Sequence, residues 1–387
     1  RTSVAGRAAR RRATHERPSQ VHRRRAMPPP AAALRALLSS ARSERRCLVM
    51  PACHDALSAA LIARAGFEVA FMSGYAVSAT SLALPDAGLI SYGEQVQVAR
   101  NVCEATRGCG LLVIGDGDTG FGGSGNVRRT VRGYAAAGLA GITIEDQVYP
   151  KRCSYARGLA VESRARAVSR VRAAVAARDE MRSDLGHDLV IIARTDCRNA
   201  EAGCEAEGEA GGGLDEAIAR CVAFEQAGAD VVYAEGLNGP HELRALAEAL
   251  EQQGVRLPLM LAQVERPGVE LVGAEEAAQL GYSLSLLGLT LLNVALKAMK
   301  RALAEMASGS HPAQAHRLSF EELYTEVGFR EHYAWEERFG EGAPQLPLPP
   351  KPDEGGARSQ RSGAEGGTAG DLAGGSSGGS RKRKARA

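Results

Sequence analysis

Eight short apolar runs, separated by longer amphipathic segments, occupy the middle of this 387-residue chain. The runs are Cys47–Ala52, Val69–Ser73, Leu111–Gly115, Gly141–Glu145, Leu189–Ala193, Asp230–Ala234, Pro258–Ala262 and Tyr282–Leu287. Continuous apolar runs are typical of strands that are covered on both faces, as in parallel sheets. Eight strand–helix units within about 250–300 residues are what a closed (β/α)8 barrel requires. We therefore predict an α/β fold of the TIM-barrel type over residues 47–345.

The segments between the runs carry helix signals. Ser91 and Glu94 form a capping box ahead of a helix over Gln95–Ala105. Leu214–Ala227 places its apolar residues on one stripe, and Gly228 is a natural stop. A doubly wound open sheet is the competing architecture, but the Gly-rich dinucleotide turn that it requires is absent after the first run.

The two ends of the chain differ from its middle in charge. Residues 1–46 hold thirteen arginines against Glu16 and Glu44, and residues 351–387 hold eight Lys and Arg against four acids. Because the whole chain carries +3, residues 47–350 carry −12. An acidic body of this kind is not a nucleic-acid-binding domain, so we expect no nucleic-acid partner.

The Arg-rich leader, residues 1–46, is expected to be disordered and to act as an organelle transit peptide, for a chloroplast or a mitochondrion. A plain basic tail, or a start at Met27, would instead leave the protein cytoplasmic. Residues 346–387 are rich in Pro, Gly and Ser and end in RKRKARA, which predicts a disordered basic tail. No apolar stretch is long enough for a membrane span, so no membrane partner is expected.

Polar residues follow the predicted strands. They are His54, Asp55, Ser73, Gly74, Asp116, Asp118, Glu145, Asp146, Arg194, Asp196, Glu235 and Gln263. Barrels of this kind build their catalytic face from the carboxyl ends of the strands. The pattern therefore predicts an active site there. The eight cysteines form no C-x-x-C pair, which argues against zinc and against a disulfide scaffold.

A metal site is predicted from acidic residues. Asp116 and Asp118 stand at alternate positions where a strand ends, so both side chains can point at one ion. Glu145 ends the next strand, and Asp86 follows an earlier one. Oxygen ligands without nitrogen or sulfur partners suit Mg²⁺, with Mn²⁺ as a substitute. The alternative is a turn stabilised by Asp side chains.

Three further predictions concern substrate handling. Cys153 lies next to Lys151 and Arg152, so its thiol is expected to have a lowered pKa and to exchange a proton, unless it is an idle loop cysteine. Arg194 is expected to clamp a carboxylate or to form a structural ion pair with Asp196 or Glu235. Ser73 and Gly74 offer backbone N–H groups to a carboxylate or form a plain turn.

Several motifs together resemble the isocitrate lyase/phosphoenolpyruvate mutase superfamily, nearest to its plant-type carboxyvinyl-carboxyphosphonate phosphorylmutase branch. That branch includes the petal death protein and lies near the methylisocitrate and dimethylmalate lyases. The motifs run in order from about residue 45 to 340: Pro51-x-x-His54-Asp55-Ala56-Leu57, Ser73-Gly74-Tyr75-Ala76-Val77, Leu84-Pro85-Asp86, Asp116-Gly-Asp118-Thr-Gly-Phe-Gly, Glu145-Asp146-Gln147, Pro150-Lys151-Arg152-Cys153 and Ala193-Arg194-Thr195-Asp196.

The resemblance implies roles for these positions. It implies a homotetramer whose last barrel helix is swapped between subunits, and a small carboxylic acid as substrate. Asp116 and Asp118 match the metal-site carboxylates, with Asp86 and Glu145 around the metal's waters, and Ser73, Gly74 and Tyr75 match the substrate-carboxylate loop. Arg194, Glu235 and Gln263 match substrate contacts. Lys151 and Cys153 fall on the gating loop, where cysteine is typical of C–C lyases and asparagine of phosphonate mutases.

The chain also departs from the family pattern. Cys153 is followed by Ser154 and Tyr155 where lyases have Gly-His, and Gln263 replaces an Asn. Residues 266–270 replace a Gly-Gly-x-Thr-Pro motif, and a Gly-rich insertion covers Ala200–Gly213. The expected function is cleavage of a small 2-hydroxy or 2-oxo dicarboxylic acid through an enolate. Phosphonopyruvate-type P–C chemistry, and a barrel that binds without turnover, are the alternatives.

Overall fold

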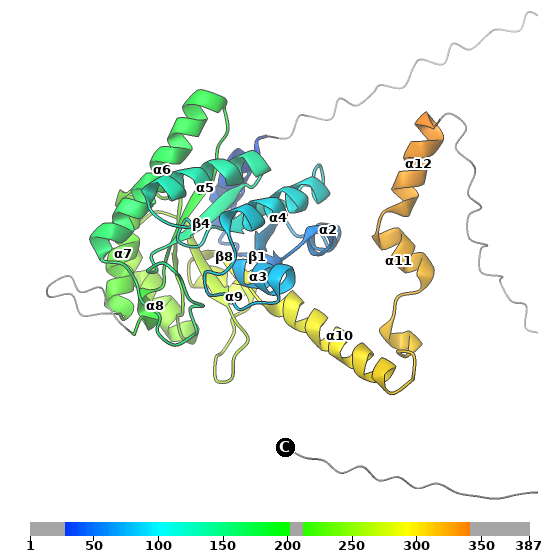
Figure 1. Ribbon diagram of the computed structural model, residues 1–387. Coiled ribbons are helices and arrows are strands. Elements are labelled where there is room, and N and C mark those ends of the chain that lie inside the picture. Colours follow the sequence, from blue (N-terminus) through cyan, green and yellow to red (C-terminus); the bar gives the residue numbers. More distant parts are fainter. Residues whose placement is uncertain (1–27, 202–211, 341–387) are drawn as a thin grey trace, which may run out of the picture. The chain divides into compact units, whose positions relative to one another are not determined.

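The computed structural model describes residues 28–201 and 212–340. Within these ranges, eight parallel strands form a closed barrel in which each strand pairs with its neighbours in chain order and β8 pairs with β1 (Figure 1). This confirms the predicted (β/α)8 barrel. The predictions for residues 1–27, for the tail 346–387 and for most of the insertion Ala200–Gly213 lie outside the described residues.

All eight predicted strands are present, with ends that shift by at most two residues. They are β1 Leu48–Cys53, β2 Val69–Met72, β3 Leu112–Asp116, β4 Gly141–Glu145, β5 Val190–Thr195, β6 Val231–Ala234, β7 Leu259–Gln263 and β8 Tyr282–Leu287. Nearly every strand residue is buried, as expected of strands that face the barrel interior on one side and helices on the other.

Helices follow the strands and surround them (Figure 1). They are α2 Ala56–Arg64, α3 Gly74–Leu82, α4 Tyr92–Ala105, α5 Ser124–Ala137, α6 Arg164–Leu185, α7 Leu214–Gln226, α8 Gly239–Gln252, α9 Ala274–Gln279 and α10 Thr290–Ala307. The capping box at the start of α4 is confirmed, because the Glu94 backbone N–H donates to Ser91 Oγ and the Ser91 N–H donates to Glu94 Oε2. Gly228 follows α7 with a φ of +93°.

A helix precedes the barrel where a disordered leader was predicted. Helix α1 spans Pro30–Ser43, and its buried residues Leu34 and Leu38 join the cluster that fills the barrel interior. Arg35 fixes the helix to the barrel, with its guanidinium 2.5 Å from Asp188 and 3.1 Å from Asp230. The leader prediction is therefore wrong from residue 30 onward, because a short amphipathic helix lies inside an Arg-rich composition.

Strand alternation explains how the site is placed. Leu112 and Ile114 belong to the interior cluster, and Asp116 follows on the same face of β3. In the same way Val190 and Ile192 precede Arg194, and Val231 and Tyr233 precede Glu235. Because residues two apart share a face of a strand, the apolar interior gives way to charged side chains at the carboxyl end of the barrel.

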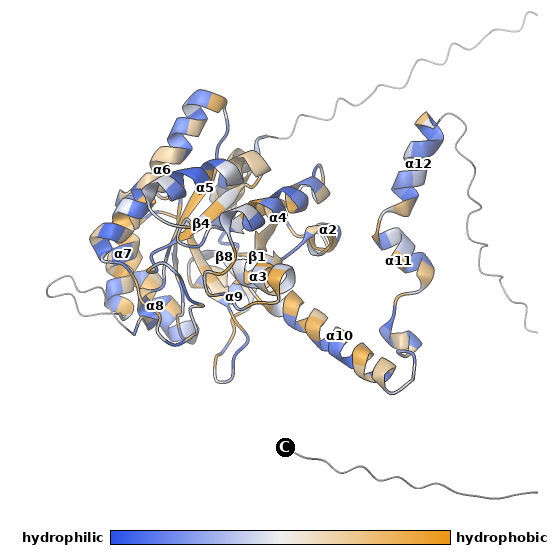
Figure 2. Ribbon diagram, in the orientation of Figure 1, coloured by the Kyte–Doolittle hydropathy of each residue, from blue (hydrophilic) through white to orange (hydrophobic). Residues whose placement is uncertain are grey.

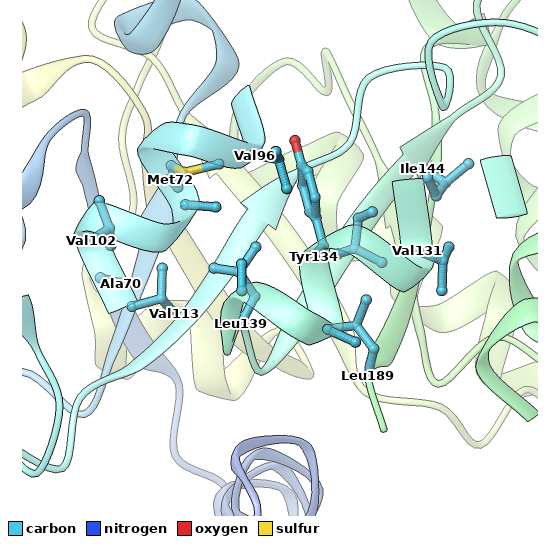
Figure 3. Close-up of a cluster of buried hydrophobic side chains, with 14 of the residues drawn as sticks. Ala70, Met72, Val96, Val102, Val113, Val131, Tyr134, Leu139, Ile144 and Leu189 are labelled. Carbon is cyan, nitrogen blue, oxygen red and sulfur yellow. The ribbon is translucent and has the colours of Figure 1, made fainter. Parts of the chain in front are cut away.

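A second hydrophobic cluster lies between the barrel and helices α4, α5 and α6 (Figure 3). Tyr134 is fully buried within it, among residues that include Val131 and Leu139. Its hydroxyl donates to the backbone carbonyl of Asp116 over 2.8 Å. The outer core therefore fixes the end of β3, where the predicted metal ligands stand.

The chain divides into two compact units, and the second begins at Glu322, within α11 (Phe320–Glu326). In the first, α10 keeps apolar residues exposed along its length (Figure 2), among them Val294 at 61% and Leu303 at 62%. The second contains most of α11 and all of α12 (Phe329–Phe339), where Tyr324 stacks on Phe329 with ring centroids 4.3 Å apart. The predicted barrel domain, 47–345, therefore extends too far. None of the described helices is long and apolar enough to cross a membrane.

Candidate active site

Asp116 is held in place by three hydrogen bonds. Its Oδ2 accepts from the Gly74 backbone N–H at 3.2 Å, and its Oδ1 accepts from Thr143 Oγ1 at 3.2 Å and from the Asp118 N–H at 3.3 Å. Asp118 adopts a φ of +46°, so the chain turns sharply just after β3. This turn, and not the strand face that the spacing predicted, places both carboxylates beside Gly74.

Lys151 joins two of the predicted metal-site acids. Its Nζ lies 2.6 Å from Asp86 Oδ1 and 2.8 Å from Asp118 Oδ1, and the lysine is only 3% exposed. Burial raises the pKa of Asp118 to about 7, while the charge of Lys151 opposes the rise. The structure thus brings together Asp86, Asp116, Asp118 and Lys151. The cation between the acids is the ammonium group of Lys151.

Glu145 is the acid without a donor. It is 1% exposed, and neither of its carboxylate oxygens accepts a hydrogen bond from any residue that the structure describes. The nearest cation is Arg194, whose Nη1 lies 3.5 Å from Glu145 Oε2. Burial raises the pKa of Glu145 well above its usual value. A buried carboxylate of this kind calls for a partner such as water or an ion.

These acids fit a hard divalent cation. Within residues 28–201 and 212–340, no three His, Cys, Asp or Glu side chains converge closely enough to hold an ion by themselves. Mg²⁺ does not need such a cage, because it keeps several waters and binds through one or two carboxylates. Asp116 and Asp118 could supply those carboxylates, and Glu145 could accept hydrogen bonds from water.

Arg194 forms the ion pair that was one of its two predicted roles. Its Nε and Nη2 contact the two Asp196 oxygens at 2.9 and 2.8 Å, which is a bidentate arrangement. Nη2 also donates to Ser154 Oγ and lies 3.8 Å from Glu235 Oε2. The guanidinium is thus fixed in orientation, with Nη1 directed toward Glu145.

Glu235 receives two tyrosine hydroxyls. Tyr155 Oη donates to Oε1 and Tyr233 Oη donates to Oε2, while the Gly236 N–H donates to Oε1 at 3.1 Å. Burial raises the pKa of Glu235 above its usual value, and Arg194 opposes the rise. Tyr155 belongs to the loop between β4 and α6, so this carboxylate links that loop to the end of β6.

The structure corrects the prediction for Cys153. The thiol is half-buried, and burial raises its pKa instead of lowering it. Lys151 and Arg194 do lower the pKa, but less than burial raises it, and the ammonium of Lys151 is directed at Asp86 and Asp118. Cys153 is therefore a protonated thiol at neutral pH, suited to donating a proton.

The predicted carboxylate loop is the start of helix α3. Ser73 caps the helix, since its Oγ accepts from the Ala76 N–H at 3.3 Å. Gly74 has no room for a side chain: a Cβ there would lie 2.8 Å from Asp116 Oδ2 and 3.2 Å from Asp118 Oδ1. Tyr75 is 36% exposed. The backbone N–H of Ser73 donates to the Cys53 carbonyl and that of Gly74 donates to Asp116 Oδ2, so neither is offered to a substrate carboxylate as predicted.

Other residues that follow strands support the site without joining it. Asp55 caps α2, and Asp146 accepts from Thr195 and from Arg220, each over less than 3 Å. Gln263 was predicted to contact substrate, but its amide bonds Val272 N, Val272 O and Ser285 Oγ at 2.7–2.8 Å. It shares a face of β7 with Leu261, which packs outside the barrel interior. Its contacts place it in a structural role.

Four residues of the site were not predicted from the sequence: Thr143, Tyr233, Ser154 and Tyr155. Thr143 and Tyr233 each stand two residues before an acid, Glu145 and Glu235, so alternation along the strand was the signal that could have found them. Ser154 and Tyr155 were treated as losses from the family pattern. In the structure, Ser154 bonds Arg194 and Tyr155 bonds Glu235.

Comparisons with known proteins show the family of this chain. Residues 37–307 match the phosphoenolpyruvate phosphomutase family. The chain is 38% identical over 266 residues to 2,3-dimethylmalate lyase of Eubacterium barkeri, covering 69% of this chain and 82% of the relative. It is 33% identical over 298 residues to the chloroplastic carboxyvinyl-carboxyphosphonate phosphorylmutase of Arabidopsis thaliana, covering 76% and 82%. A solved structure of oxaloacetate acetylhydrolase with 3,3-difluorooxalacetate superimposes with a TM-score of 0.70 at 29% identity, covering 80% of this chain and 97% of that one.

Proposed function

This chain belongs to the isocitrate lyase/phosphoenolpyruvate mutase superfamily, and we propose on that premise that it is a Mg²⁺-dependent carbon–carbon lyase. It is an enzyme of a superfamily whose members are named lyases and mutases. The proposed substrate is a small 2-hydroxy or 2-oxo dicarboxylic acid, of the substituted malate, methylisocitrate or oxaloacetate type. The observation that carries the proposal is the buried acid cluster, where Lys151, from the loop that also carries Cys153, contacts Asp86 and Asp118 over 2.6 and 2.8 Å.

The acid cluster supports the choice of metal. Asp116 and Asp118 would hold Mg²⁺ or Mn²⁺, with Asp86 and Glu145 around the waters of the ion. Both oxygens of Glu145 lack a donor among the described residues, which is consistent with hydrogen bonds to such waters. Bound Mg²⁺ would supply Lewis-acid stabilisation of negative charge on substrate oxygens.

The protein groups account for the rest of the reaction. For a 2-hydroxy acid, a carboxylate of the acid cluster takes the hydroxyl proton, and the C–C bond breaks to leave one fragment as a 2-oxo acid. The other fragment is left as an enolate, whose negative charge the fixed guanidinium of Arg194 stabilises. Cys153 donates the proton that the carbanion carbon requires. Glu235 holds the loop closed through Tyr155, so that water is excluded while the enolate exists.

The test uses the full chain with Mg²⁺ and four acids: 2,3-dimethylmalate, 2-methylisocitrate, oxaloacetate and phosphonopyruvate. We expect cleavage of at least one of the first three, with products identified by mass, and loss of activity after chelation. Asp116→Asn should abolish calorimetric Mg²⁺ uptake in the presence of oxalate. Turnover that is unaffected by chelation would overturn the metal-dependent proposal.

Two alternatives are resolved by the same panel. P–C bond chemistry is favoured by the similarity to a phosphorylmutase, and it requires that phosphonopyruvate alone be converted. A barrel that binds but does not turn over would take up Mg²⁺ and oxalate and release no product from any acid. Cys153 argues against the first alternative, and the intact contacts of Asp116, Lys151 and Arg194 argue against the second.

We also propose that the chain forms a homo-oligomer, a tetramer by family resemblance, through helix α10. Val294, Met299 and Leu303 on this helix are 53–62% exposed. An apolar stripe of this kind on an 18-residue helix is typical of a surface that a protein partner covers.

A further inference from the structure

Arg266 carries a positive charge that the site does not compensate. It lies in the loop between β7 and α9, and its guanidinium carbon is 4.0 Å from the centre of the Tyr155 ring. The side chain is half-buried, and its Nε is inaccessible to solvent and has no acceptor within residues 28–201 and 212–340. A buried donor without an acceptor costs stability, so it calls for an explanation.

The loop that carries Arg266 is anchored at both sides. Gln263 ends β7 and bonds both backbone groups of Val272, which closes the loop at its base. Glu265 accepts a hydrogen bond from Thr290 Oγ1 at the start of α10. Because hydrogen bonds hold both the residue before Arg266 and the base of the loop, the backbone that carries the guanidinium is fixed in position.

One side chain, Tyr155, connects Arg266 to the active site. Tyr155 lies under Arg266 and donates its hydroxyl to Glu235, and Glu235 Oε2 is 3.8 Å from Arg194 Nη2. The acids here are already engaged: Glu235 by two tyrosines and Asp196 by Arg194. Neither forms an ion pair with Arg266 in the part of the chain that the structure describes.

We propose that Arg266 binds an additional carboxylate of the substrate, remote from the end held at Asp116 and Asp118. The enzyme would then prefer a 2-hydroxy acid with three carboxylates over one with two. A guanidinium can bond a carboxylate bidentately, and stacking on Tyr155 fixes its plane for that purpose. This inference rests on the proposed lyase function and names the substrate class of the same site.

Two acids form a matched pair for the test. 2-Methylisocitrate and 2,3-dimethylmalate share the bond to be cleaved and both release pyruvate, but 2-methylisocitrate carries a carboxylate on the carbon that is a methyl group in the other. With the Mg²⁺-loaded full chain, Arg266→Met should lower kcat/KM for 2-methylisocitrate by about ten- to a hundredfold and leave 2,3-dimethylmalate unchanged. Arg266→Lys, which keeps the charge without the planar fork, should fall between. Arg244→Met, at an exposed position of α8, is the matched control.

A binding measurement separates this inference from the proposed function. Succinate and propionate are the fragments that the two acids leave beside pyruvate, and their calorimetric affinities need no turnover. If the chain cleaves neither of these acids nor oxaloacetate, the lyase proposal fails, yet weaker succinate binding by Arg266→Met would still support the carboxylate site. Equal effects of Arg266→Met on both acids and on both fragments would show that Arg266 only braces Tyr155, and would overturn the inference.

Discussion

The ammonium of Lys151 lies 2.8 Å from a carboxylate oxygen of Asp118, and both side chains are 3% exposed. The lysine comes from the loop after β4 and the aspartate from the turn after β3. Their contact therefore joins the loop after β4 to the acid cluster. Because both charges are buried, each stabilises the ionised form of the other, and the position of the loop depends on the charge of the cluster.

Replacing Lys151 with Met should destabilise the metal-free protein strongly. Asp86 and Asp118 would remain buried without a cation, which typically costs about 3–5 kcal/mol in the free energy of unfolding. Mg²⁺ should restore part of the loss, because a bound cation stabilises the folded state. Urea unfolding with and without Mg²⁺ measures both effects.

The exposed pair of Arg107 and Glu104 provides the control. Its side chains are 75% and 69% exposed, so Arg107→Met should change stability by less than about 1 kcal/mol. Similar losses in the two variants would contradict the view that Lys151 compensates the acid cluster.

Gly74→Ala should weaken metal binding without unfolding the protein. The added Cβ would meet Asp116 Oδ2 at 2.8 Å, so the carboxylate has to move away from its present place. We expect Mg²⁺ affinity to fall at least about tenfold, since a displaced ligand loses binding geometry. Gly93→Ala is the matched control on α4, where the nearest atom is Ser91 Oγ at 3.8 Å. Calorimetry that finds equal Mg²⁺ affinity in both variants would exclude a metal at Asp116.

Cys153 should give the reaction an alkaline limit. Burial raises the pKa of the thiol, and a proton donor works only in its protonated form. kcat should therefore stay level through neutral pH and fall only above the ordinary cysteine pKa of about 8.5. Cys153→Ser should lower kcat by about a hundred- to ten-thousandfold and remove the alkaline fall, because a serine hydroxyl does not ionise there. A fall that begins below pH 7 in the unmodified enzyme would contradict a protonated thiol.

Much of the fold could be predicted because its signals are local. Each β-strand is a short apolar run, and the capping box of Ser91 and Glu94 involves residues three apart. Helix α1 was missed since the arginines around it dominate the composition, although Leu34 and Leu38 have helical spacing. The two leucines are buried because α1 packs against one end of the barrel, and that contact is not visible in the sequence.

The candidate site was predictable in position and not in detail. Strand ends indicated Asp116, Glu145, Arg194 and Glu235, because parallel strands of a barrel end on one face. The pKa of Cys153 depends on burial and on where Lys151 points, neither of which follows from adjacency in the chain. Gln263 illustrates the same limit, since the face it occupies depends on the register of β7.

Helix α10 leads to a prediction about assembly. Val294 and Leu303 are 61% and 62% exposed on this helix, more than expected of large apolar side chains in a chain that remains a monomer. Glu at both positions would place charges where a second copy is proposed to pack, and buried unpaired charges are costly. We therefore expect Val294→Glu/Leu303→Glu to sediment as a smaller species than the unmodified chain. Leu185→Glu is the control, because Leu185 is equally exposed, at 58%, at the end of α6. An unmodified chain that sediments as a monomer at all concentrations would contradict the proposed oligomer.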